Sequence, residues 1–335
     1  MEPISVVIPT YNRAKLLVRA LISVCAAISG CDEIIVVDDG STDETAAVVT
    51  AATAPWKDRV HYLPIPQSGA GHARNAGIAA CRNDLIAFAD SDDKWLPYRL
   101  ELQRPVMENE PKLAFCFSDF GQLLPDGNVV PHWLVHWSGD TRPWERILAP
   151  GRPYAERWPL PAGLPRSDGG VRMHEGSMYA RELHANYVNV NTLLARRSVI
   201  GDALHFGEDL PTHEDWECFA RIARTGDCVY LDVDTAIQCA HEGPRLTQAS
   251  LLESAQARMK VVERTWAGDP EFMRSHGKEV TAVLADLRRT VLRQLIRLNR
   301  RDEAREILAR CDGAWLERLA LMLPHAVLRR LGRGA

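Results

Sequence analysis

The chain has 335 residues, 46% of them hydrophobic and 25% charged, and a formal net charge of −4 at pH 7. This composition is typical of a globular protein long enough to bury a core without disulfide or metal staples, and it gives no sign of nucleic-acid binding. The eight cysteines include no Cys-x-x-Cys pair, which argues against a zinc knuckle and favours a reducing compartment.

Strands and helices alternate through the first third of the chain. Short apolar runs that predict strands occur at residues 4–8, 34–37, 60–63, 85–89 and 113–117. After the second run, Ser41-Thr42-Asp43-Glu44 predicts a capping box in which Ser41 caps the next helix. The alternation predicts an α/β fold with a mainly parallel, doubly wound sheet flanked by helices. Ligands of such sheets bind beyond the carboxyl ends of the strands.

The pattern changes in the middle of the chain. Residues 121–185 are rich in Pro, Gly and Trp, which predicts an irregular insertion or lid. Its tryptophans could stack on sugar faces or form the insertion's own core; they are Trp133, Trp137, Trp144 and Trp158. A helix over residues 214–225 and a strand over 229–231 follow, and the rest of the chain is helical and Arg-rich. We therefore expect one α/β domain over 1–245 and a C-terminal helical region over 246–335.

The ends of the chain bear on its location. The N-terminal residues lead directly into a strand, without a signal-peptide pattern, and no apolar stretch approaches the ~20 residues that span a bilayer. We expect a cytoplasmic, non-integral protein. The C-terminal run Leu328–Arg333 could be a peripheral contact with anionic lipid at the inner face of a membrane, or a solvated helix end. Whether the C-terminal helices contact a membrane, and whether the chain forms a homo-oligomer, stays open.

The sharpest local signal is the acidic loop that contains Asp90 and Asp92. Residues two apart at the end of a strand point the same way, so the two carboxylates could hold a hard cation such as Mg²⁺ or Mn²⁺. Such a cation could bind a substrate diphosphate and neutralise its charge as it leaves. The alternative is a solvated acidic turn, because Asp and Ser are common turn residues.

Two other strand ends carry polar groups. Asp39 follows the second strand, where its carboxylate could accept a hydrogen bond from a nucleoside, or could simply belong to a turn. Gly69–Gly77 enters a helix through a Gly-rich loop and contains Arg74 and Asn75. The N-terminus of a helix favours anions, although this segment matches neither a Walker loop nor a dinucleotide fingerprint.

Later in the chain, Asp215 begins an amphipathic helix. Its carboxylate could deprotonate an acceptor hydroxyl, or could only complement the helix dipole together with Glu214. His241 could be a metal ligand or a phosphate contact, and Arg245 could pair with phosphate. A lone histidine is more often part of the polar surface or of the core.

Taken together, these segments resemble glycosyltransferase family 2, of the GT-A fold. The resemblance rests on Ser5–Arg13, Val37–Asp43, Gly71–Gly77, Ala89–Asp93 and Glu214–Trp216. Their order and spacing agree from about residue 3 to 245. The resemblance implies a Rossmann-like GT-A domain with a C-terminal helical appendage that the family pattern does not cover.

The resemblance also implies roles for individual residues. Pro9, Tyr11 and Asp39 would border the base and ribose of a nucleotide sugar, and Arg74 and Asn75 belong to the next block. Asp90 and Asp92 would form the metal motif, with Asp92 the direct ligand, and His241 lies where several relatives carry a histidine that contacts metal or diphosphate. Asp215 would be the general base of a single, inverting displacement.

The function implied is transfer of a sugar from a uridine or thymidine diphosphate donor to an acceptor hydroxyl, in the synthesis of a surface polysaccharide or a lipid-linked glycoconjugate. The family's usual Gly-Gly-Phe-Asp is absent before residue 214, where the chain reads Ala203–Asp209. A degenerate nucleotide-sugar-binding or scaffold protein of the same fold is the alternative. A sugar-phosphate nucleotidylyltransferase would need a Gly-rich N-terminal loop, which Pro9–Arg13 lacks.

Overall fold

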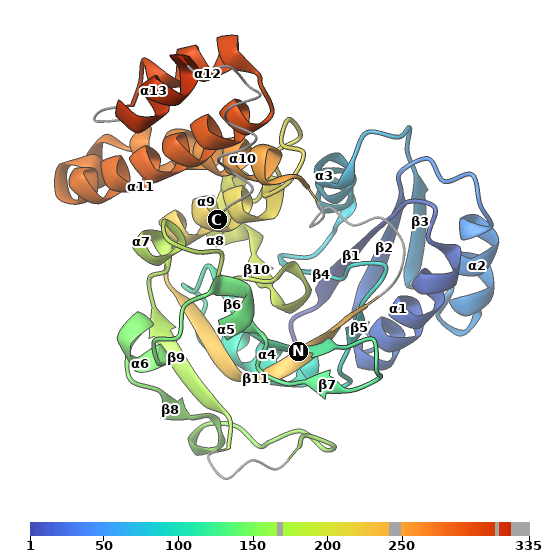
Figure 1. Ribbon diagram of the computed structural model, residues 1–335. Coiled ribbons are helices and arrows are strands. Elements are labelled where there is room, and N and C mark those ends of the chain that lie inside the picture. The colour runs from blue at the N-terminus through green and yellow to red at the C-terminus, as the bar shows by residue number, and fades with distance from the viewer. Residues whose placement is uncertain (166–169, 241–248, 312–314, 323–335) are drawn as a thin grey trace. The chain divides into compact units, whose positions relative to one another are not determined.

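The computed structural model describes residues 1–165, 170–240, 249–311 and 315–322 (Figure 1). It divides into two compact units. The first unit comprises Met1–Glu208 with Cys218–Gly243, and the second comprises Asp209–Glu217 with Pro244–Ala335. Asp209–Glu217 thus groups with the C-terminal helices. The domain boundary at residue 245 stays a prediction.

All strands of the described ranges belong to the first unit, where eleven of them form one sheet. The main path runs β3-β2-β1-β4-β10-β6-β11-β9-β8, while β5 pairs with β11 and β7 pairs with β6. The strands are β1 (Ile4–Thr10), β2 (Glu33–Asp38), β3 (Val60–Pro64), β4 (Leu85–Phe88), β5 (Lys94–Trp95), β6 (Phe115–Leu123), β7 (Val129–Val130), β8 (Arg152–Pro153), β9 (Arg172–Gly176), β10 (Leu194–Arg196) and β11 (Cys228–Cys239).

The sheet is mixed, with a parallel half built by the first part of the chain. Strands β3, β2, β1 and β4 are parallel to one another, and β6 and β11 form a second parallel pair. Strand β10 lies antiparallel between β4 and β6, so the carboxyl ends of β4 and β6 reach the same edge of the sheet. This arrangement confirms the α/β fold predicted from the alternating pattern.

The helices of the first unit connect and cover these strands. They are α1 (Ala14–Ala27), α2 (Thr45–Ala52), α3 (Ala70–Ala80), α4 (Arg99–Asn109), α5 (Leu134–Ser138), α6 (Trp144–Ile147), α7 (Tyr179–Glu182) and α8 (Arg197–Ile200), while α9 (Glu214–Thr225) crosses the boundary between the units. Short 3₁₀ turns are η1 (Ala54–Trp56), η2 (Tyr154–Glu156), η3 (Val190–Thr192) and η4 (Gly201–Ala203). Helix α3 packs closely on β1 and β2, because a Cβ atom on Gly77 would lie only 2.3 Å from Val7 Cγ1.

The predicted capping box at Ser41 is wrong. Helix α2 begins at Thr45, and the Ser41 hydroxyl instead accepts a hydrogen bond from the backbone N–H of Asn12 at 2.9 Å. The first turn of α2 is held by Asp43, whose carboxylate accepts bonds from the N–H and hydroxyl groups of Thr45. The Ser41 side chain, which the local pattern assigned to the start of the helix, therefore bonds to a residue 29 positions away in sequence.

The insertion over 121–185 forms small elements that extend the sheet through β7, β8 and β9. Its tryptophans pack on neighbouring aromatic side chains. Trp137 contacts Phe120, Trp158 contacts Tyr154, and Trp144 stacks on Tyr230 with ring centroids 3.7 Å apart. The aromatic residues therefore give the insertion a core, and each of these tryptophans remains partly accessible.

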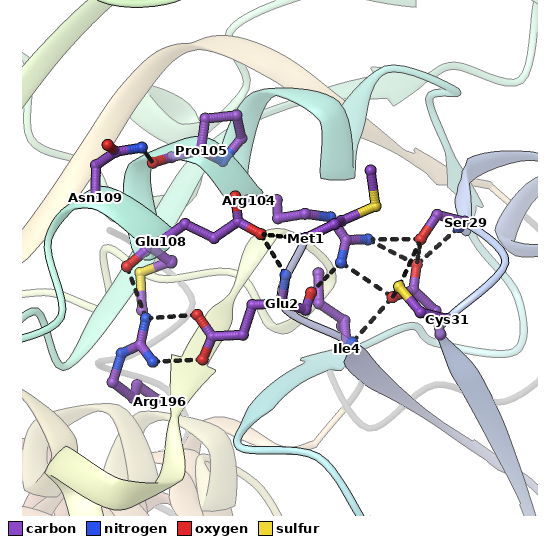
Figure 2. Close-up of polar contacts among 12 residues, drawn as sticks. Met1, Glu2, Ile4, Ser29, Cys31, Arg104, Pro105, Glu108, Asn109 and Arg196 are labelled. Carbon is purple, nitrogen blue, oxygen red and sulfur yellow. Dashed lines mark hydrogen bonds and ion pairs between the residues drawn. The ribbon is translucent and has the colours of Figure 1, made fainter.

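A buried polar network joins the start of β1 to α4 (Figure 2). The Arg104 guanidinium lies 2.6 Å from a carboxylate oxygen of Asp32, and the two side chains are 7% and 0% exposed. Asp32 also accepts the backbone N–H of Ile4 at 2.9 Å. Burial alone would raise the pKa of Asp32, but the hydrogen bonds from Arg104, Ser29 and Ile4 lower it below its ordinary value.

We expect Asp32→Ala to lower the free energy of unfolding by about 3–5 kcal/mol, because it leaves the Arg104 charge buried without its partner. The pKa of Asp32 is lowered in the folded protein, so its stabilisation is present above about pH 4 and is lost on acidification. Urea denaturation at pH 7 and pH 3 measures both effects, with the exposed Asp58→Ala as control. A loss below 1 kcal/mol at pH 7 would contradict the expectation.

The second unit is helical. It contains α10 (Leu251–Val262), a π-helical turn η6 (Glu263–Ala267), α11 (Pro270–Arg297), α12 (Arg301–Leu308) and α13 (Trp315–Met322). Its core includes Leu252 of α10, Val291 and Leu295 of α11, and Leu321 of α13. Ser250 and Glu253 form a capping box at the start of α10. In the described ranges no helix combines the length and the low polarity that crossing a bilayer requires.

Candidate active site

The predicted metal motif lies in the loop that follows β4, at the carboxyl edge of the parallel half of the sheet. The Asp90 carboxylate is 2.9 Å from the Arg74 guanidinium, and the Asp92 carboxylate is 2.8 Å from that of Arg13. Arg74 comes from α3, and Arg13 from the residue that precedes α1. Three segments of the first unit thus meet at this loop, where two carboxylates alternate with two guanidinium groups.

Asn191 fixes the backbone and side chains of the acidic loop. Its side-chain oxygen accepts the backbone N–H of Asp90 at 2.6 Å. Its side-chain nitrogen donates to the carboxylates of Asp90 and Asp93, at 3.1 and 2.7 Å. Asp93 in turn accepts the N–H of Cys239 at 2.8 Å, which ties the loop to the end of β11. Loop geometry is therefore held from several sides, as a site for a charged ligand requires.

The electrostatics of the loop suit a cation. Burial raises the pKa of Asp90 above its ordinary value, Arg74 opposes the shift, and the negative charge of Asp92 adds to it. A bound divalent cation would relieve the mutual repulsion of the two carboxylates. Their hard oxygen ligands are those that Mg²⁺ and Mn²⁺ prefer. The residues present therefore fit a metal of this type, while His241 lies outside the described residues.

Asp39 positions the loop that leads into α3. Its two carboxylate oxygens accept the backbone N–H groups of Ser68 and Gly69, at 2.7 and 2.8 Å, and its side chain is buried. Gly69 has a φ of 98°, a left-handed conformation that favours glycine. Asp39 thus shapes this loop. Pro9 lies near the end of β1, and Tyr11 directly follows its last residue. Tyr11 is 39% exposed, so its ring is accessible to a ligand.

Arg74 and Asn75 occupy adjacent positions on α3 but make different contacts. The Arg74 guanidinium lies over the ring of Phe206, 5.2 Å from its centroid, while it pairs with Asp90. Asn75 exchanges two hydrogen bonds with the backbone of Phe206, at 2.8 and 2.9 Å. Arg74 therefore lies with the acidic loop, whereas Asn75 holds the segment that follows α8.

Asp215 belongs to the second unit, at the start of α9. Its carboxylate accepts the backbone N–H of Trp216 at 2.7 Å, and its side chain is partly accessible. The Trp216 ring is buried against Trp266 of the same unit, with centroids 5.7 Å apart. His213 precedes the helix with a left-handed φ of 63° and donates or accepts a bond with Ser254 at 2.9 Å. Packing therefore fixes the turn that carries Asp215.

A second polar cluster lies where the insertion meets β6 and β11, and sequence reasoning missed it. Ligand atoms of Asp119, His132 and Asp234 lie within 4.8 Å of one another, so these side chains could hold a metal ion. His132 Nδ1 is 3.6 Å from carboxylate oxygens of both Asp119 and Asp232. The contact with Asp119 and the charges of Asp234 and Asp232 raise the pKa of His132 to about 9. Up to 115 residues separate these positions, so no local pattern could reveal the cluster.

Sequence reasoning also missed Arg13, Asn191 and Asp93 at the first site. Arg13 and Asp93 lie within the segments that carry the family resemblance, and this position in the sequence could have marked them as candidate site residues. Asn191 follows an irregular stretch and has no such signal. The structure brings together Arg74, Asp90 and Asp92 in the first unit. Asp39 follows β2, which β1 separates from β4 in the sheet. The roles of these residues and of Asp215 stay predictions.

Comparison with known proteins agrees with the resemblance. Residues 5–158 match a family model described as "Glycosyl transferase family 2". The succinoglycan biosynthesis protein ExoO of Rhizobium meliloti is 43% identical over 98 residues, which are 29% of this chain and 27% of ExoO. Across eight curated relatives the match spans between 18% and 52% of the relative's length. Most of each relative's length therefore lies outside the comparison for all but one of them.

Solved structures share the fold. TarS 1–349 of S. aureus, in complex with UDP-GlcNAc, aligns with a TM-score of 0.58 at 18% identity, over 86% of this chain and 71% of that one. The mannosyltransferase PcManGT of Pyrobaculum calidifontis, in complex with GDP-Man and Mn²⁺, aligns with a TM-score of 0.57 at 15% identity, over 98% and 79%. At these identities the likeness establishes the fold, which is of the GT-A type.

Proposed function

We propose that this chain, whose residues 5–158 belong to glycosyltransferase family 2, transfers a sugar from a nucleoside diphosphate donor to an acceptor hydroxyl. One observation carries the proposal. The carboxylates of Asp90 and Asp92 stand at a strand end with the guanidinium groups of Arg74 and Arg13 beside them. This alternation of charge complements a divalent cation together with a diphosphate, since carboxylates bind the cation and guanidinium groups bind phosphate oxygens.

In this proposal the ends of β1 and β2 receive the nucleoside. Pro9 and Tyr11 border the base, and Asp39 lies beside the ribose. Each Asp39 oxygen already accepts one backbone N–H, but a carboxylate offers about four lone-pair sites in all. Capacity therefore remains for a ribose hydroxyl, while the existing bonds keep the side chain in place.

Asp90 and Asp92 would hold a Mg²⁺ or Mn²⁺ ion in the proposed complex, with Asp92 as the direct ligand and His241 as a further candidate. When bound, the ion neutralises charge on the diphosphate leaving group. Arg74 and Arg13 orient the two carboxylates and can contact phosphate oxygens. The side-chain nitrogen of Asn191 donates to both Asp90 and Asp93 and so fixes their carboxylates, which then need not rearrange when a ligand binds.

The proposed chemical step is one in-line displacement. The acceptor oxygen forms a bond to the anomeric carbon of the donor sugar as the bond from that carbon to the diphosphate oxygen breaks. The electron pair leaves with the nucleoside diphosphate, and the acceptor proton passes to the carboxylate of Asp215. Because attack and departure occur on opposite faces, the anomeric configuration inverts.

The comparisons support a substrate class. The structure of TarS contains UDP-GlcNAc, and that of PcManGT contains GDP-Man. ExoO is a succinoglycan biosynthesis protein. We propose a uridine or thymidine diphosphate sugar as donor and a growing polysaccharide or lipid-linked glycan as acceptor, at the cytoplasmic face of a membrane. Nucleic acid is not part of this scheme.

Calorimetric titration with UDP, dTDP, GDP and ADP, each with and without Mn²⁺, tests the proposal. We expect one uridine or thymidine nucleotide to bind in a Mn²⁺-dependent manner, because the carboxylates alone repel a diphosphate. Magnesium should substitute for manganese. Absence of binding for all four nucleotides under both conditions would favour the degenerate scaffold over the enzyme.

A further inference from the structure

A cavity of about 210 Å³ lies between the insertion and the sheet of the first unit. Pockets that bury drug-sized ligands usually measure about 300–1,000 Å³, so this cavity suits a single small ring rather than a nucleotide. Strand β6 contributes Asp119, strand β11 contributes Asp232, and the insertion contributes His132, Ser138 and Trp144. The cavity thus exists only because the insertion folds against these two strands.

The lining combines apolar and polar side chains. Trp144 is partly accessible, and one face of its ring is already covered by Tyr230. The other apolar and aromatic residues of the wall are Leu134, Val135, Ile147 and Tyr187. The carboxylates of Asp119 and Asp232, the imidazole of His132 and the hydroxyl of Ser138 provide hydrogen-bonding groups. A pyranose ring has the same division, with C–H groups on its faces and hydroxyl groups around its edge.

The charges favour an uncharged ligand over an anionic one. Asp140 is paired with Arg142 through contacts of 2.6–3.0 Å, so this pair adds no net charge. Asp119 and Asp232 share the single imidazole of His132, and Asp234 accepts the His132 backbone N–H at 3.0 Å. Three carboxylates therefore face one cationic ring. A carboxylate or phosphate on the ligand would be repelled, whereas hydroxyl groups can donate to the carboxylate oxygens.

The sheet register places the cavity near the acidic loop. Leu194 of β10 pairs with Ala87 of β4 on one side and with Cys116 of β6 on the other. Three residues further along, Asp119 still lies on β6, whereas Asp90 lies two residues beyond the end of β4, so the two residues are roughly level. Two strand spacings of roughly 4.8 Å separate them, a distance of about 10 Å. A ring in the cavity would thus be a neighbour of a ligand at Asp90 and Asp92.

We propose that this cavity binds one neutral pyranose unit of the acceptor glycan, with its face against Trp144 and its hydroxyl groups on Asp119 and Asp232. The inference rests on the proposed transferase function, because that function supplies the reason for a sugar beside the acidic loop. It concerns a different set of residues from the donor site. The cavity selects a neutral sugar, and it discriminates against uronic acids and phosphorylated sugars.

Saturation-transfer NMR with methyl glycosides of glucose, galactose, mannose and N-acetylglucosamine tests the inference on the full chain, with and without UDP and the diamagnetic ion Mg²⁺. Methyl glucuronoside serves as the anionic probe. We expect at least one neutral glycoside to bind saturably. The glucuronoside should bind at least about 10-fold more weakly, because its carboxylate replaces a hydroxyl group that could donate to Asp119 or Asp232 and adds a repelling charge; a hydrogen bond to a charged group alone contributes a factor of that order. Competition between methyl glucuronoside and the bound neutral glycoside gives the affinity of the glucuronoside.

Two conservative variants locate the binding. Asp232→Asn keeps the shape of the side chain and removes a negative charge, and Trp144→Phe reduces the aromatic surface without opening the wall. Each variant should lower the affinity for the neutral glycoside about 5- to 10-fold. Asp232→Asn should also reduce the difference in affinity between the neutral glycoside and the glucuronoside. The matched controls are Asp126→Asn and Trp158→Phe, which change the same residue types in the insertion but outside the cavity lining.

The outcomes separate this inference from the proposed function. If no glycoside binds under either condition, or if the cavity variants bind as well as the wild type, the cavity is not a sugar site; nucleotide binding by calorimetry can still succeed in that case. If glycosides bind in the cavity while no nucleotide binds anywhere, the cavity assignment holds and the transferase function fails.

Discussion

Replacing Asp92 with alanine is expected to weaken Mn²⁺-dependent nucleotide binding by at least about 100-fold. The reason is that Asp92 would be a direct ligand of the ion, and loss even of an outer-shell partner costs a metal site about 10- to 100-fold. Removing the carboxylate also leaves the Arg13 guanidinium, 2.8 Å away, without its partner. Calorimetric titration of the nucleotide that binds the wild type, at fixed Mn²⁺, measures the change.

A second comparison excludes a general structural effect. Asp202→Ala removes an exposed carboxylate from the same unit and should bind nucleotide as the wild type does. Asp92→Asn retains the shape of the side chain. It should bind nucleotide as weakly as Asp92→Ala does if the negative charge of residue 92 is what the metal requires. Unchanged Mn²⁺-dependent affinity in Asp92→Ala would place the metal elsewhere, and the cluster of Asp119, His132 and Asp234 would become the first alternative.

Replacing Asp215 with asparagine is expected to reduce turnover by about 10²- to 10⁴-fold, the usual contribution of a general base. The asparagine side chain can still accept the Trp216 N–H, so the start of α9 should be preserved. It cannot take the acceptor proton. Release of nucleoside diphosphate in the presence of donor and acceptor measures the rate, and calorimetry measures donor affinity, which should not change.

The matched control for this variant is Asp227→Asn, an exposed residue just beyond the other end of α9. It should retain both turnover and donor affinity. Wild-type turnover in Asp215→Asn would assign the base to another group. Loss of donor binding together with turnover would mean that Asp215 supports the donor site rather than the proton transfer.

The two large effects have different physical origins, which makes them separable. In the proposed mechanism Asp92 would act before the reaction, since the ion and the diphosphate would have to be bound for transfer to begin. As the proposed general base, Asp215 would act only as the acceptor oxygen develops its bond, so we expect its loss to change the rate and to leave the affinity for the donor unchanged. A double variant should therefore show the binding defect of Asp92→Ala, with no further loss of affinity from Asp215→Asn.

The parallel half of the sheet could be predicted from sequence because its signals are local. Short apolar runs such as Ile34–Val37 are buried on both faces, and each gives way to polar residues where the strand ends. The positions of Asp39, Asp90 and Asp92 follow from the same feature, because a residue after a strand lies at the edge of the sheet. The family resemblance used these same strand ends, and the comparisons confirm it.

The rest depended on contacts that no local pattern encodes. Asn191 reaches Asp90 across 101 residues, and the cavity joins β6, β11 and the insertion, which lie up to 113 residues apart at Asp119 and Asp232. The insertion has no period of 2 or 3.6 residues, because its short elements are held by aromatic packing on the sheet. Ser41 shows the same limit: its hydroxyl was equally suited to capping a helix, and tertiary structure gave it to Asn12 instead. Sequence by itself thus determined the strand-end chemistry, while tertiary packing decided which side chains share a site.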